Sequence, residues 1–382
     1  MRLRLFLVPA SAMLTDHRPH GDGLVGYGFI RELGGRGHDL EVAAGRVDLA
    51  GALPGSVRVH ALGQDGPSRP AFMWRLRRLY ERLARERPFD AVHQLTPVDV
   101  GVSLALPRDA PLVLGPYVPD WAPSGPGADR EVGALALRVK RSLRRAQQAR
   151  ADAVLLSTAA AAGKLELNGS RRERVHELPL GVDAGFWRPA PSPAEGLDVL
   201  YLAGLEVRKG IHVLLDAWER LSPRIPEARL LLAGDGAERD AVLERLRSTE
   251  RLARVELAGR LDREAARAAM QACAVFCLPS YGDPAPLAAV EAMACGRPVV
   301  ATDASGLGKL VPDAGGIKVP QGDAGRLAEA LAELLGDRDR REAMGASNRR
   351  AVEERYSWPR VVDRLEELYV GAASRRPGRG RP

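Results

Sequence analysis

The chain has 382 residues, of which 45% are hydrophobic and 27% charged, and this is ordinary for a globular protein long enough to form two domains. No apolar run approaches about 18 residues, which excludes a membrane-spanning helix. The three cysteines show neither metal-ligand spacing nor a disulfide framework. Because no apolar run of that length occurs, we expect a cytoplasmic protein. The net charge is +7, but no aromatic or groove-reading motif of nucleic-acid binding accompanies it, so we expect no nucleic-acid partner.

Residues 1–184 alternate short apolar strands with helical patterns. Pro9 interrupts the apolar run after two N-terminal arginines, so this run is predicted to be a strand and not a signal peptide. We predict strands at 3–8, 39–43, 57–60, 91–93, 112–114, 153–157 and 175–178, and helices at 27–35, 72–86, 98–106, 131–149 and 159–167.

A Gly- and Pro-rich segment at 181–196 marks the boundary to a second half of the same kind. We predict strands at 199–203, 229–233, 255–257, 275–278, 299–301 and 317–319, and helices at 209–220, 239–248, 263–272, 284–294, 325–335, 338–355 and 358–370. Short β-branched strands between helices are typical of parallel sheets covered on both faces. The fold class is therefore α/β with two doubly wound parallel-sheet domains, 1–184 and 185–357, followed by a terminal helix (358–373) and a disordered basic tail (374–382).

A glycine cluster follows the first strand. Gly21 and Gly23, on either side of Asp22, precede a predicted helix, and glycines at such a place allow a phosphate to approach the backbone closely. The alternative is an ordinary turn, because a short glycine cluster alone is weak evidence.

Four residues of the first half are candidates for binding an acceptor molecule. His93 ends a predicted strand and is either a general base or pocket residue, or a histidine satisfied by its neighbours. Tyr117, Asp120 and Trp121 follow the next strand, and aromatic rings beside a carboxylate suit a sugar or cyclitol. A tryptophan in the core is the rival interpretation.

The predicted helix at 131–149 is strongly basic. Arg138, Arg141 and Arg145 share one of its faces, with Lys140 and Arg144 nearby. This cluster favours contact with an anionic lipid at a membrane periphery, contact with an anionic acceptor, or simply a solvated helix face.

The loop before the helix at 209–220 carries two cations. Arg208 and Lys209 lie at the start of that helix, where the helix dipole disfavours positive charge unless an anion is bound. A diphosphate would resolve the conflict. The alternative for Arg208 is a solvated side chain.

The segment PSYGDPAPLAAVEAMACGRP, which begins at Pro279, is the most informative of the chain. It reads as a strand end, an N-cap at Asp283, a helix of small residues and a stop at Gly296. A helix that opens at the carboxyl end of a parallel strand offers backbone N–H groups to an anion, here those of Ala285, Leu287 and Ala288. Glu291 lies eight residues after Asp283, roughly 12 Å along the axis, which is too far for a glycosidase pair and suits two contacts on one long ligand.

This segment resembles the signature of glycosyltransferase family 4, and the resemblance extends along nearly the whole chain. It implies a GT-B fold with a cleft between two domains, a terminal helix that crosses back to the first domain, and transfer of a hexosyl group from a UDP- or GDP-sugar to a hydroxyl acceptor with retention of configuration. In the family pattern Gly21 contacts the donor phosphate, Lys209 grips the diphosphate, and the loop of Arg260 and Leu261 reads the nucleobase. The same pattern assigns the transferred sugar to the position of Asp283 and the ribose to Glu291.

The chain departs from the family at three places. Asp283 stands where the family has Glu, the first loop arginine is missing so that Arg208 is a candidate replacement, and no His occurs near Tyr117. We find no enzymic nucleophile and no Asp-x-Asp metal site, so we expect no cofactor or metal, with the leaving phosphate accepting the acceptor's proton. Two alternatives stay open, a GT-B nucleotide-sugar epimerase and a non-catalytic nucleotide-binding scaffold.

Overall fold

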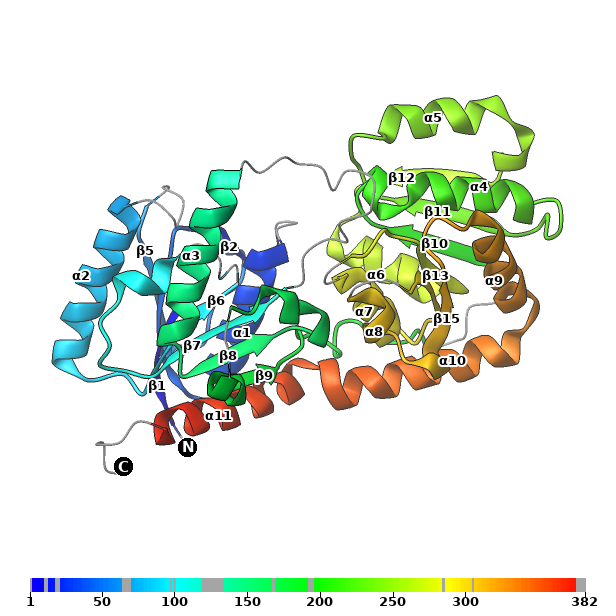
Figure 1. Ribbon diagram of the computed structural model, residues 1–382. Helices are drawn as coiled ribbons and strands as arrows, with labels where there is room; N and C mark the ends of the chain where they lie inside the picture. Colours follow the sequence, from blue (N-terminus) through cyan, green and yellow to red (C-terminus); the bar gives the residue numbers. More distant parts are fainter. Residues whose placement is uncertain are drawn as a thin grey trace. The chain divides into compact units, whose positions relative to one another are not determined.

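The computed structural model describes residues 2–9, 13–17, 21–63, 70–96, 98, 101–118, 134–166, 169–191, 196–283, 286–303 and 306–375 (Figure 1). The chain forms two compact units. Unit 1 contains Met1–Pro119, Glu131–Gly181 and Trp358–Pro382, and unit 2 contains Asp120–Arg130 and Val182–Ser357. The longer segment of unit 2 thus begins at residue 182, whereas the sequence predicts a boundary between residues 184 and 185.

Unit 1 is built on a seven-stranded parallel sheet with the order β5-β3-β1-β6-β7-β8-β9, and a separate parallel pair joins β2 to β4. Five of the seven sheet strands are buried along their whole length, which is the pattern of a sheet covered on both faces, and only the edge strands β5 and β9 are not. The strands are β1 Arg4–Pro9, β2 Met13–Thr15, β3 Asp39–Ala44, β4 Arg46–Asp48, β5 Val57–Ala61, β6 Ala91–Leu95, β7 Leu112–Tyr117, β8 Ala153–Leu156 and β9 Val175–Glu177.

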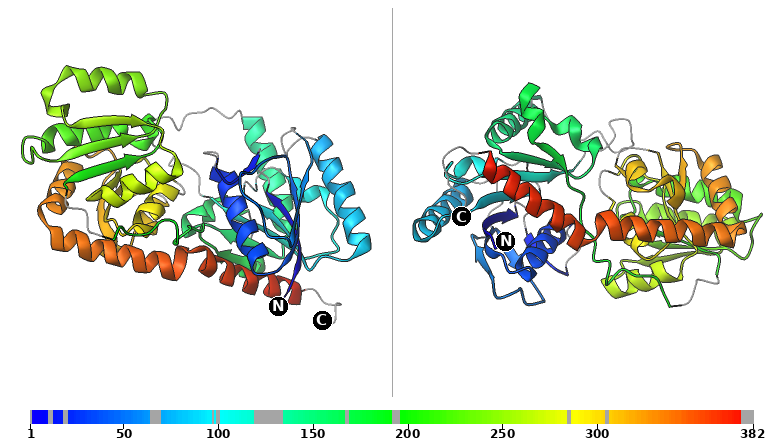
Figure 2. Two further views of the ribbon diagram at one scale, coloured as in Figure 1. Left: turned by 180° about the vertical axis from the view of Figure 1, so that it is seen from behind. Right: turned by 90° about the horizontal axis from the view of Figure 1, so that it is seen from below.

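Helices cover the two faces of this sheet. The helix α11 runs beside α1, as both views of Figure 2 show, while α2 and α3 both contact the short 3₁₀ turn η1. The helical segments are α1 Gly21–Gly35, α2 Pro70–Glu86, η1 Val102–Ala105, α3 Ala134–Arg150, η2 Ala159–Lys164, η3 Gly169–Arg174 and α11 Trp358–Ser374.

Three expectations for unit 1 are wrong. The predicted helix at 98–106 is only the turn η1, because Gly101 adopts a left-handed conformation (φ 75°) that ends any preceding helix. The predicted helix at 159–167 is the 3₁₀ segment η2, too short for a helix to be stable by propensity alone. The helix predicted at 27–35 begins at Gly21, and the pair β2 and β4 was not predicted.

Unit 2 is built on a six-stranded parallel sheet with the order β12-β11-β10-β13-β14-β15. Its strands are β10 Asp198–Leu202, β11 Arg229–Ala233, β12 Val255–Gly259, β13 Val275–Leu278, β14 Val299–Thr302 and β15 Gly316–Val319. Its helical segments are η4 Val207–Lys209, α4 Ile211–Leu221, α5 Arg239–Ser248, η5 Glu250–Leu252, α6 Arg263–Ala272, α7 Leu287–Ala294, α8 Leu307–Leu310, η6 Asp313–Gly315, α9 Ala324–Gly336, α10 Arg338–Ala351 and the π-helical η7 Val352–Tyr356.

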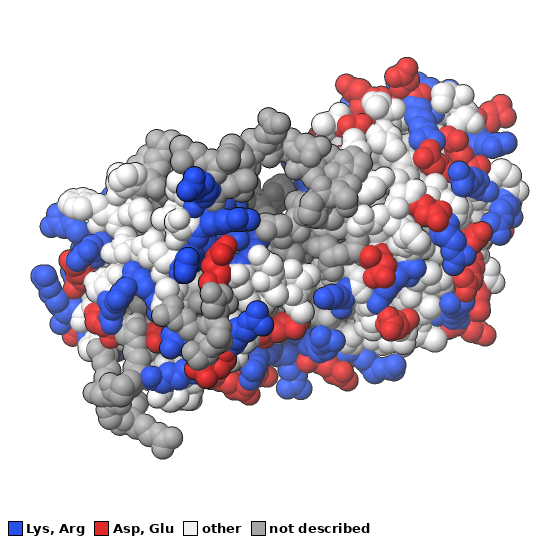
Figure 3. Space-filling model, in the orientation of Figure 1, with Lys and Arg blue, Asp and Glu red and all other residues white. Residues whose placement is uncertain are grey.

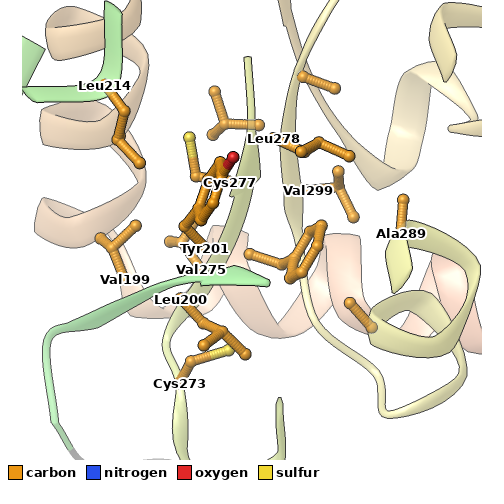
Figure 4. Close-up of a cluster of buried hydrophobic side chains, with 14 of the residues drawn as sticks. Val199, Leu200, Tyr201, Leu214, Cys273, Val275, Cys277, Leu278, Ala289 and Val299 are labelled. Atoms are coloured by element: carbon orange, nitrogen blue, oxygen red, sulfur yellow. The ribbon is translucent and has the colours of Figure 1, made fainter. Parts of the chain in front are cut away.

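The core of unit 2 lies around the two central strands. Side chains of β10 and β13 meet there, and helices α4 and α7 contribute Leu214 and Ala289 (Figure 4). The three cysteines are buried in this core, and burial raises the pKa of each thiol. Small side chains on α7 allow this helix to pack closely on the sheet, which fixes the position of its first turn. Within the described parts of the chain no helix has both the length and the apolar character needed to cross a bilayer.

Candidate functional site

The sheet of unit 2 reverses its direction of winding between β10 and β13. The chain proceeds from β10 through β11 to β12 toward one edge, and from β13 through β14 to β15 toward the other. The loops that follow β10 and β13 therefore separate at the carboxyl edge of the sheet, which is where doubly wound proteins bind their ligands. These two loops carry Lys209 and Asp283.

Lys209 and Asp283 form an ion pair at this point. Nζ of Lys209 donates to Oδ2 of Asp283, and the two side chains are 17% and 6% exposed. The backbone N–H of Asp283 donates to Oγ of Ser280 over 3.1 Å, and Ser280 is fully buried. A largely buried but still accessible cation thus lies at the switch point, held by a carboxylate whose own loop is anchored in the core.

Gly210 explains why the two loops can meet. It adopts φ 75°, and a Cβ at this position would lie 1.9 Å from the carbonyl oxygen of Pro279. The N–H of Tyr281 also donates to the carbonyl of Arg208 over 2.9 Å. Only glycine permits this approach, so the sequence Lys209-Gly210 places the amine beside the loop after β13.

The prediction that Asp283 caps the following helix is wrong. Helix α7 begins at Leu287, and Pro286 precedes it without a side-chain cap. The carboxylate of Asp283 faces Lys209 instead, so its charge is used in an ion pair. Leu287 and Ala288 form the first turn as expected, while Ala285 lies outside the described residues.

Glu291 lies on α7, one turn after Leu287. Burial raises the pKa of its carboxyl to about 7, although the nearby charge of Arg263 lowers it. Arg263 stacks on the ring of Phe186, 4.0 Å from its centroid, and pairs with Asp183 at 3.5 Å. Near pH 7 the carboxyl group of Glu291 is therefore about half protonated and half ionised, and it lies close to the start of α7.

Three neighbouring loops of unit 2 are tied together at the same edge of the sheet. The N–H of Gly234, after β11, donates to the carbonyl of Gly259 at the end of β12 over 2.7 Å. The N–H of Leu205, after β10, donates to the carbonyl of Asp235 over 3.1 Å. This places the predicted residues Arg260 and Leu261, after β12, in the same group of loops.

The three other predicted residues of these loops differ in their surroundings. Arg208 pairs with Glu206. Arg260 has a side chain that is 71% exposed and lies 3.8 Å from Asp235. Leu261 is partly buried against the core. Of these side chains, that of Arg260 is the most accessible to a ligand.

The sheet of unit 1 also changes winding direction, between β1 and β6. Oγ1 of Thr96, after β6, donates to Oδ1 of Asp22 over 3.3 Å, and Asp22 follows β1 along the chain. Gly21 and Gly23 lie beside Asp22, but they form the first turn of α1 and not a loop before it. A Cβ at Gly21 would meet nothing within 4 Å, so the protein itself does not require glycine there.

The interpretation of His93 as a base or acceptor ligand is wrong. The ring is fully buried, with Nδ1 2.7 Å from the hydroxyl of Tyr369 and Nε2 3.0 Å from the carbonyl of Gly115. Burial lowers its pKa to about 4, against a weaker raising effect of the Gly115 carbonyl. Both ring nitrogens are occupied, so His93 is the satisfied histidine that was its alternative.

Tyr117 is also misassigned as an acceptor ligand. It ends strand β7 with no exposed area and belongs to the hydrophobic core of unit 1. The other two acceptor candidates, Asp120 and Trp121, lie outside the described residues.

One polar cluster of unit 1 was not anticipated. Nδ1 of His17 lies 2.9 Å from Oδ1 of Asp16, and Nε2 lies 3.8 Å from Asp48, with the imidazole 40% exposed. Burial alone would raise the pKa of Asp16, but hydrogen bonds from Ala50, His17 and Gly51 outweigh it and lower this pKa. The dipeptide Asp16-His17 just before the glycine cluster was the available signal. Among the described residues, no group of three or more His, Cys, Asp or Glu side chains could hold a metal ion.

Comparison with known proteins gives the same assignment for both units. Residues 27–181 match the family model described as glycosyl transferase 4-like domain, and residues 187–351 match the model of glycosyl transferases group 1. A phosphatidyl-myo-inositol mannosyltransferase of Mycobacterium leprae is 35% identical over 207 residues, covering 52% of this chain and 54% of that protein. The chain spans about half the length of the curated relatives it matches.

Solved structures share the fold over nearly the whole chain. Sucrose-phosphate synthase from Thermosynechococcus elongatus has a TM-score of 0.73 at 22% identity, covering 97% of this chain and 98% of that chain. Anabaena HepE in complex with UDP-glucose has a TM-score of 0.69 at 20% identity, covering 97% and 100%. The predicted GT-B class, with two parallel-sheet α/β domains, is thereby confirmed.

Proposed function

Since the chain belongs to the glycosyltransferases whose two family models match its two units, we propose that it transfers a hexosyl group from a UDP- or GDP-sugar to a hydroxyl acceptor, with retention of configuration. The observation that supports this most is the Lys209–Asp283 pair at the switch point of unit 2. HepE, whose fold is similar, was solved with UDP-glucose, which favours a uridine nucleotide.

The donor's diphosphate is proposed to bind at the carboxyl edge of unit 2. The amine of Lys209 would contact it together with the N–H groups of Leu287 and Ala288, which point out of the first turn of α7. The ion pair with Asp283 keeps the amine in place before the donor arrives. A diphosphate carries more negative charge than one carboxylate, so it competes well for this cation.

The remainder of the nucleotide is proposed to extend along α7 and the loop after β12. Glu291 in its ionised form accepts hydrogen bonds from two ribose hydroxyls, which would compensate for the burial that now raises its pKa. Backbone groups of Arg260 and Leu261 contact the base, and Arg208 supports the diphosphate when it leaves Glu206.

Catalysis in this proposal depends on stabilising the departing diphosphate. Negative charge grows on the phosphate oxygens as the glycosidic bond breaks, and Lys209 is the fixed cation beside them. Asp283 then accepts hydrogen bonds from the hydroxyls of the transferred sugar. We assign no metal and no enzymic nucleophile, and the leaving phosphate takes the acceptor's proton.

Unit 1 is proposed to bind the acceptor through the cluster of Asp16, His17 and Asp48. With Nδ1–H of His17 donated to Asp16, Nε2 of the exposed ring can accept a hydrogen bond from a hydroxyl group, and Asp48 adds a second acceptor. Such a group of acceptors suits a molecule with several hydroxyls, such as a sugar or cyclitol. The Mycobacterium leprae relative, by its name, acts on a phosphatidyl-myo-inositol.

Thermal unfolding in the presence of UDP, GDP, ADP and TDP tests the donor assignment. We expect UDP or GDP to raise the unfolding temperature and the others to have little effect. Incubation with the matching nucleotide sugar and a panel of cyclitols and sugars, followed by mass spectrometry, should then show a glycosylated product and free nucleoside diphosphate. Stabilisation by nucleotide without any turnover would favour the scaffold alternative, and the absence of any nucleotide effect would contradict the proposal.

A further inference from the structure

We propose that the face of unit 1 formed by α2 and α3 docks on a membrane surface that contains anionic lipids. This inference goes beyond the proposed function and does not depend on it. It rests on the charge of α3, on the exposed side of α2 and on the side of the sheet that the two helices share.

Helix α3 carries only one sign of charge. Its 17 residues include six Lys and Arg side chains and no Asp or Glu. Arg138, Lys140, Arg141 and Arg145 are exposed, and basic side chains gather over this helix in Figure 3. The ion pairs found among the described residues do not include Arg138, Arg141 or Arg145. In the described part of the chain, the positive charges of these three arginines on the outer face of α3 are therefore not neutralised by an ion pair.

The inner face of α3 is fixed to the sheet by buried amides. Nε2 of Gln147 donates to Oε1 of Gln94 and to Oγ of Ser103, each over 2.8 Å. Gln148 donates to the carbonyl of Lys164 over 2.9 Å and accepts from the N–H of Glu166 over 2.7 Å. Because these contacts hold the helix in one rotation, Arg138, Arg141 and Arg145 stay on its outer face, while Arg144 is buried.

Helix α2 presents an aromatic ring beside further cations. Trp74 is 60% exposed, the most exposed large hydrophobic side chain among the described residues, and the guanidinium of Arg78 lies 4.9 Å from its ring centroid. Arg82 and Arg85 are exposed as well. The opposite side of α2 packs into the core through Leu76 and its neighbours, so this amphipathic helix lies flat on unit 1.

The two helices lie on the same side of the sheet, since both contact η1. An exposed tryptophan among arginines is typical of a surface that sits at the level of lipid headgroups, where the ring is half-solvated and the cations meet phosphates. Val139, 52% exposed on α3, adds a second apolar contact. Nucleic acid fits less well, because Trp74 is the one exposed ring among the described residues of α2 and α3, which offers no stacking platform, and no groove-reading motif accompanies the charge.

Sedimentation of the full chain with vesicles tests this proposal. Vesicles of phosphatidylcholine alone are compared with vesicles that also contain phosphatidylglycerol. We expect binding to the anionic vesicles only, and weaker binding as salt is raised. The triple variant Arg138→Gln, Arg141→Gln, Arg145→Gln should lower the partition coefficient by on the order of 100-fold.

A matched variant removes the same number of charges elsewhere. Arg326→Gln, Arg338→Gln, Arg340→Gln changes three arginines of unit 2 that pair with carboxylates, and it should leave vesicle binding unchanged. We expect the tryptophan fluorescence of the wild type to shift to the blue on anionic vesicles, and Trp74→Phe should remove this shift. Thermal unfolding with UDP, read on every variant, reports on the nucleotide site separately.

Four results would overturn the docking surface. They are equal binding to both vesicle types, unchanged binding by the α3 variant, equal loss in the unit 2 variant, and binding to an oligonucleotide without binding to vesicles. A missing response to UDP with normal vesicle binding would count against the proposed function and leave this surface standing.

Discussion

Tyr369 on helix α11 donates its hydroxyl hydrogen to Nδ1 of His93 on strand β6, over 2.7 Å. Nε2–H of the same ring donates to the carbonyl of Gly115 over 3.0 Å, which fixes a neutral imidazole. Residues separated by 276 positions are thus joined in the core of unit 1. The histidine that the sequence suggested for catalysis instead fastens the last helix of the chain to the sheet.

Removing the Tyr369 hydroxyl should destabilise unit 1. Tyr369→Phe leaves Nδ1 of His93 buried without a donor, so we expect the free energy of unfolding to fall by about 1–3 kcal/mol, measured by urea denaturation. Tyr80→Phe is the control, because its hydroxyl bonds to Asp109 at a partly exposed site and water can replace it. Equal losses in the two variants would contradict this role of His93.

The pH dependence of stability should report on Glu291. Its carboxyl has a pKa of about 7 in the folded protein and about 4.5 in the unfolded chain, so the folded state alone keeps the proton between these values. The resulting stability is complete below pH 4.5 and is lost as pH rises through 7, by roughly 3 kcal/mol.

Glu291→Gln keeps the shape and removes the titration. We expect its unfolding curves to vary less between pH 5 and pH 8 than those of the wild type, with the variant the more stable at pH 8. The same variant should bind UDP more weakly at pH 8, because an ionised carboxylate is the better ribose acceptor. An identical pH profile in both proteins would place the titrating group elsewhere.

Lys209→Met should reduce turnover more than tenfold, since the cation beside the diphosphate is lost. The variant also leaves Asp283 nearly buried without its partner, which costs about 1–3 kcal/mol of stability. The double variant Lys209→Met, Asp283→Asn should recover stability without recovering turnover. Lys318→Met, which breaks the exposed Lys318–Asp313 pair of the same unit, is the control and should change turnover much less. Restored turnover in the double variant would mean that Lys209 serves only the ion pair.

Gly210 and Gly37 offer a matched pair of substitutions. Both have positive φ, but a Cβ at Gly210 would strike Pro279 whereas one at Gly37 meets nothing within 4 Å. Gly37→Ala should cost about 1 kcal/mol from backbone conformation alone. Gly210→Ala should cost at least twice that and weaken UDP binding, because the two loops must separate. Similar costs, from thermal unfolding of both variants, would argue against the close contact.

His17→Ala should impair the acceptor side and spare the donor side. We expect a raised KM for the acceptor found in the screen, with unchanged stabilisation by UDP. His176→Ala, on the edge strand β9 of the same unit, is a control of the same chemical type. A loss of UDP stabilisation in His17→Ala would contradict the assignment of this cluster to the acceptor.

Local signals predicted most of the framework. The bounds of β11, β13, α5 and α6 agree with the sequence prediction, because each element begins and ends at strong local features. Asp262, for example, caps α6 by accepting from the N–H of Ala265 over 2.8 Å. The sequence wrongly predicts helices at the short segments η1 and η2. Local propensity favours a helix there, but it does not show that tertiary packing is missing to stabilise a longer one.

Asp283 shows why the site was harder to predict than the fold. Its neighbours in sequence make it look like the capping residue Asp262, with a helix directly after it. Its carboxylate forms an ion pair with Lys209, 74 residues earlier in the chain. The helix begins only at Leu287, after Pro286. Likewise no residue near His93 in the sequence indicates that its ring forms a hydrogen bond with Tyr369. Contacts between distant residues decided both roles.

The N–H of Val182 donates to the carbonyl of Tyr356 over 2.7 Å, and Val182 pairs with Ser357 in a single parallel bridge. The two ends of the segment 182–357, which makes up most of unit 2, therefore lie side by side, so that this segment has the form of a cassette inserted into the chain of unit 1. A cassette with neighbouring ends can be excised, exchanged for that of a relative, or circularly permuted without stretching the chain. Donor preference, if it resides there, becomes a property that can be transplanted as one piece.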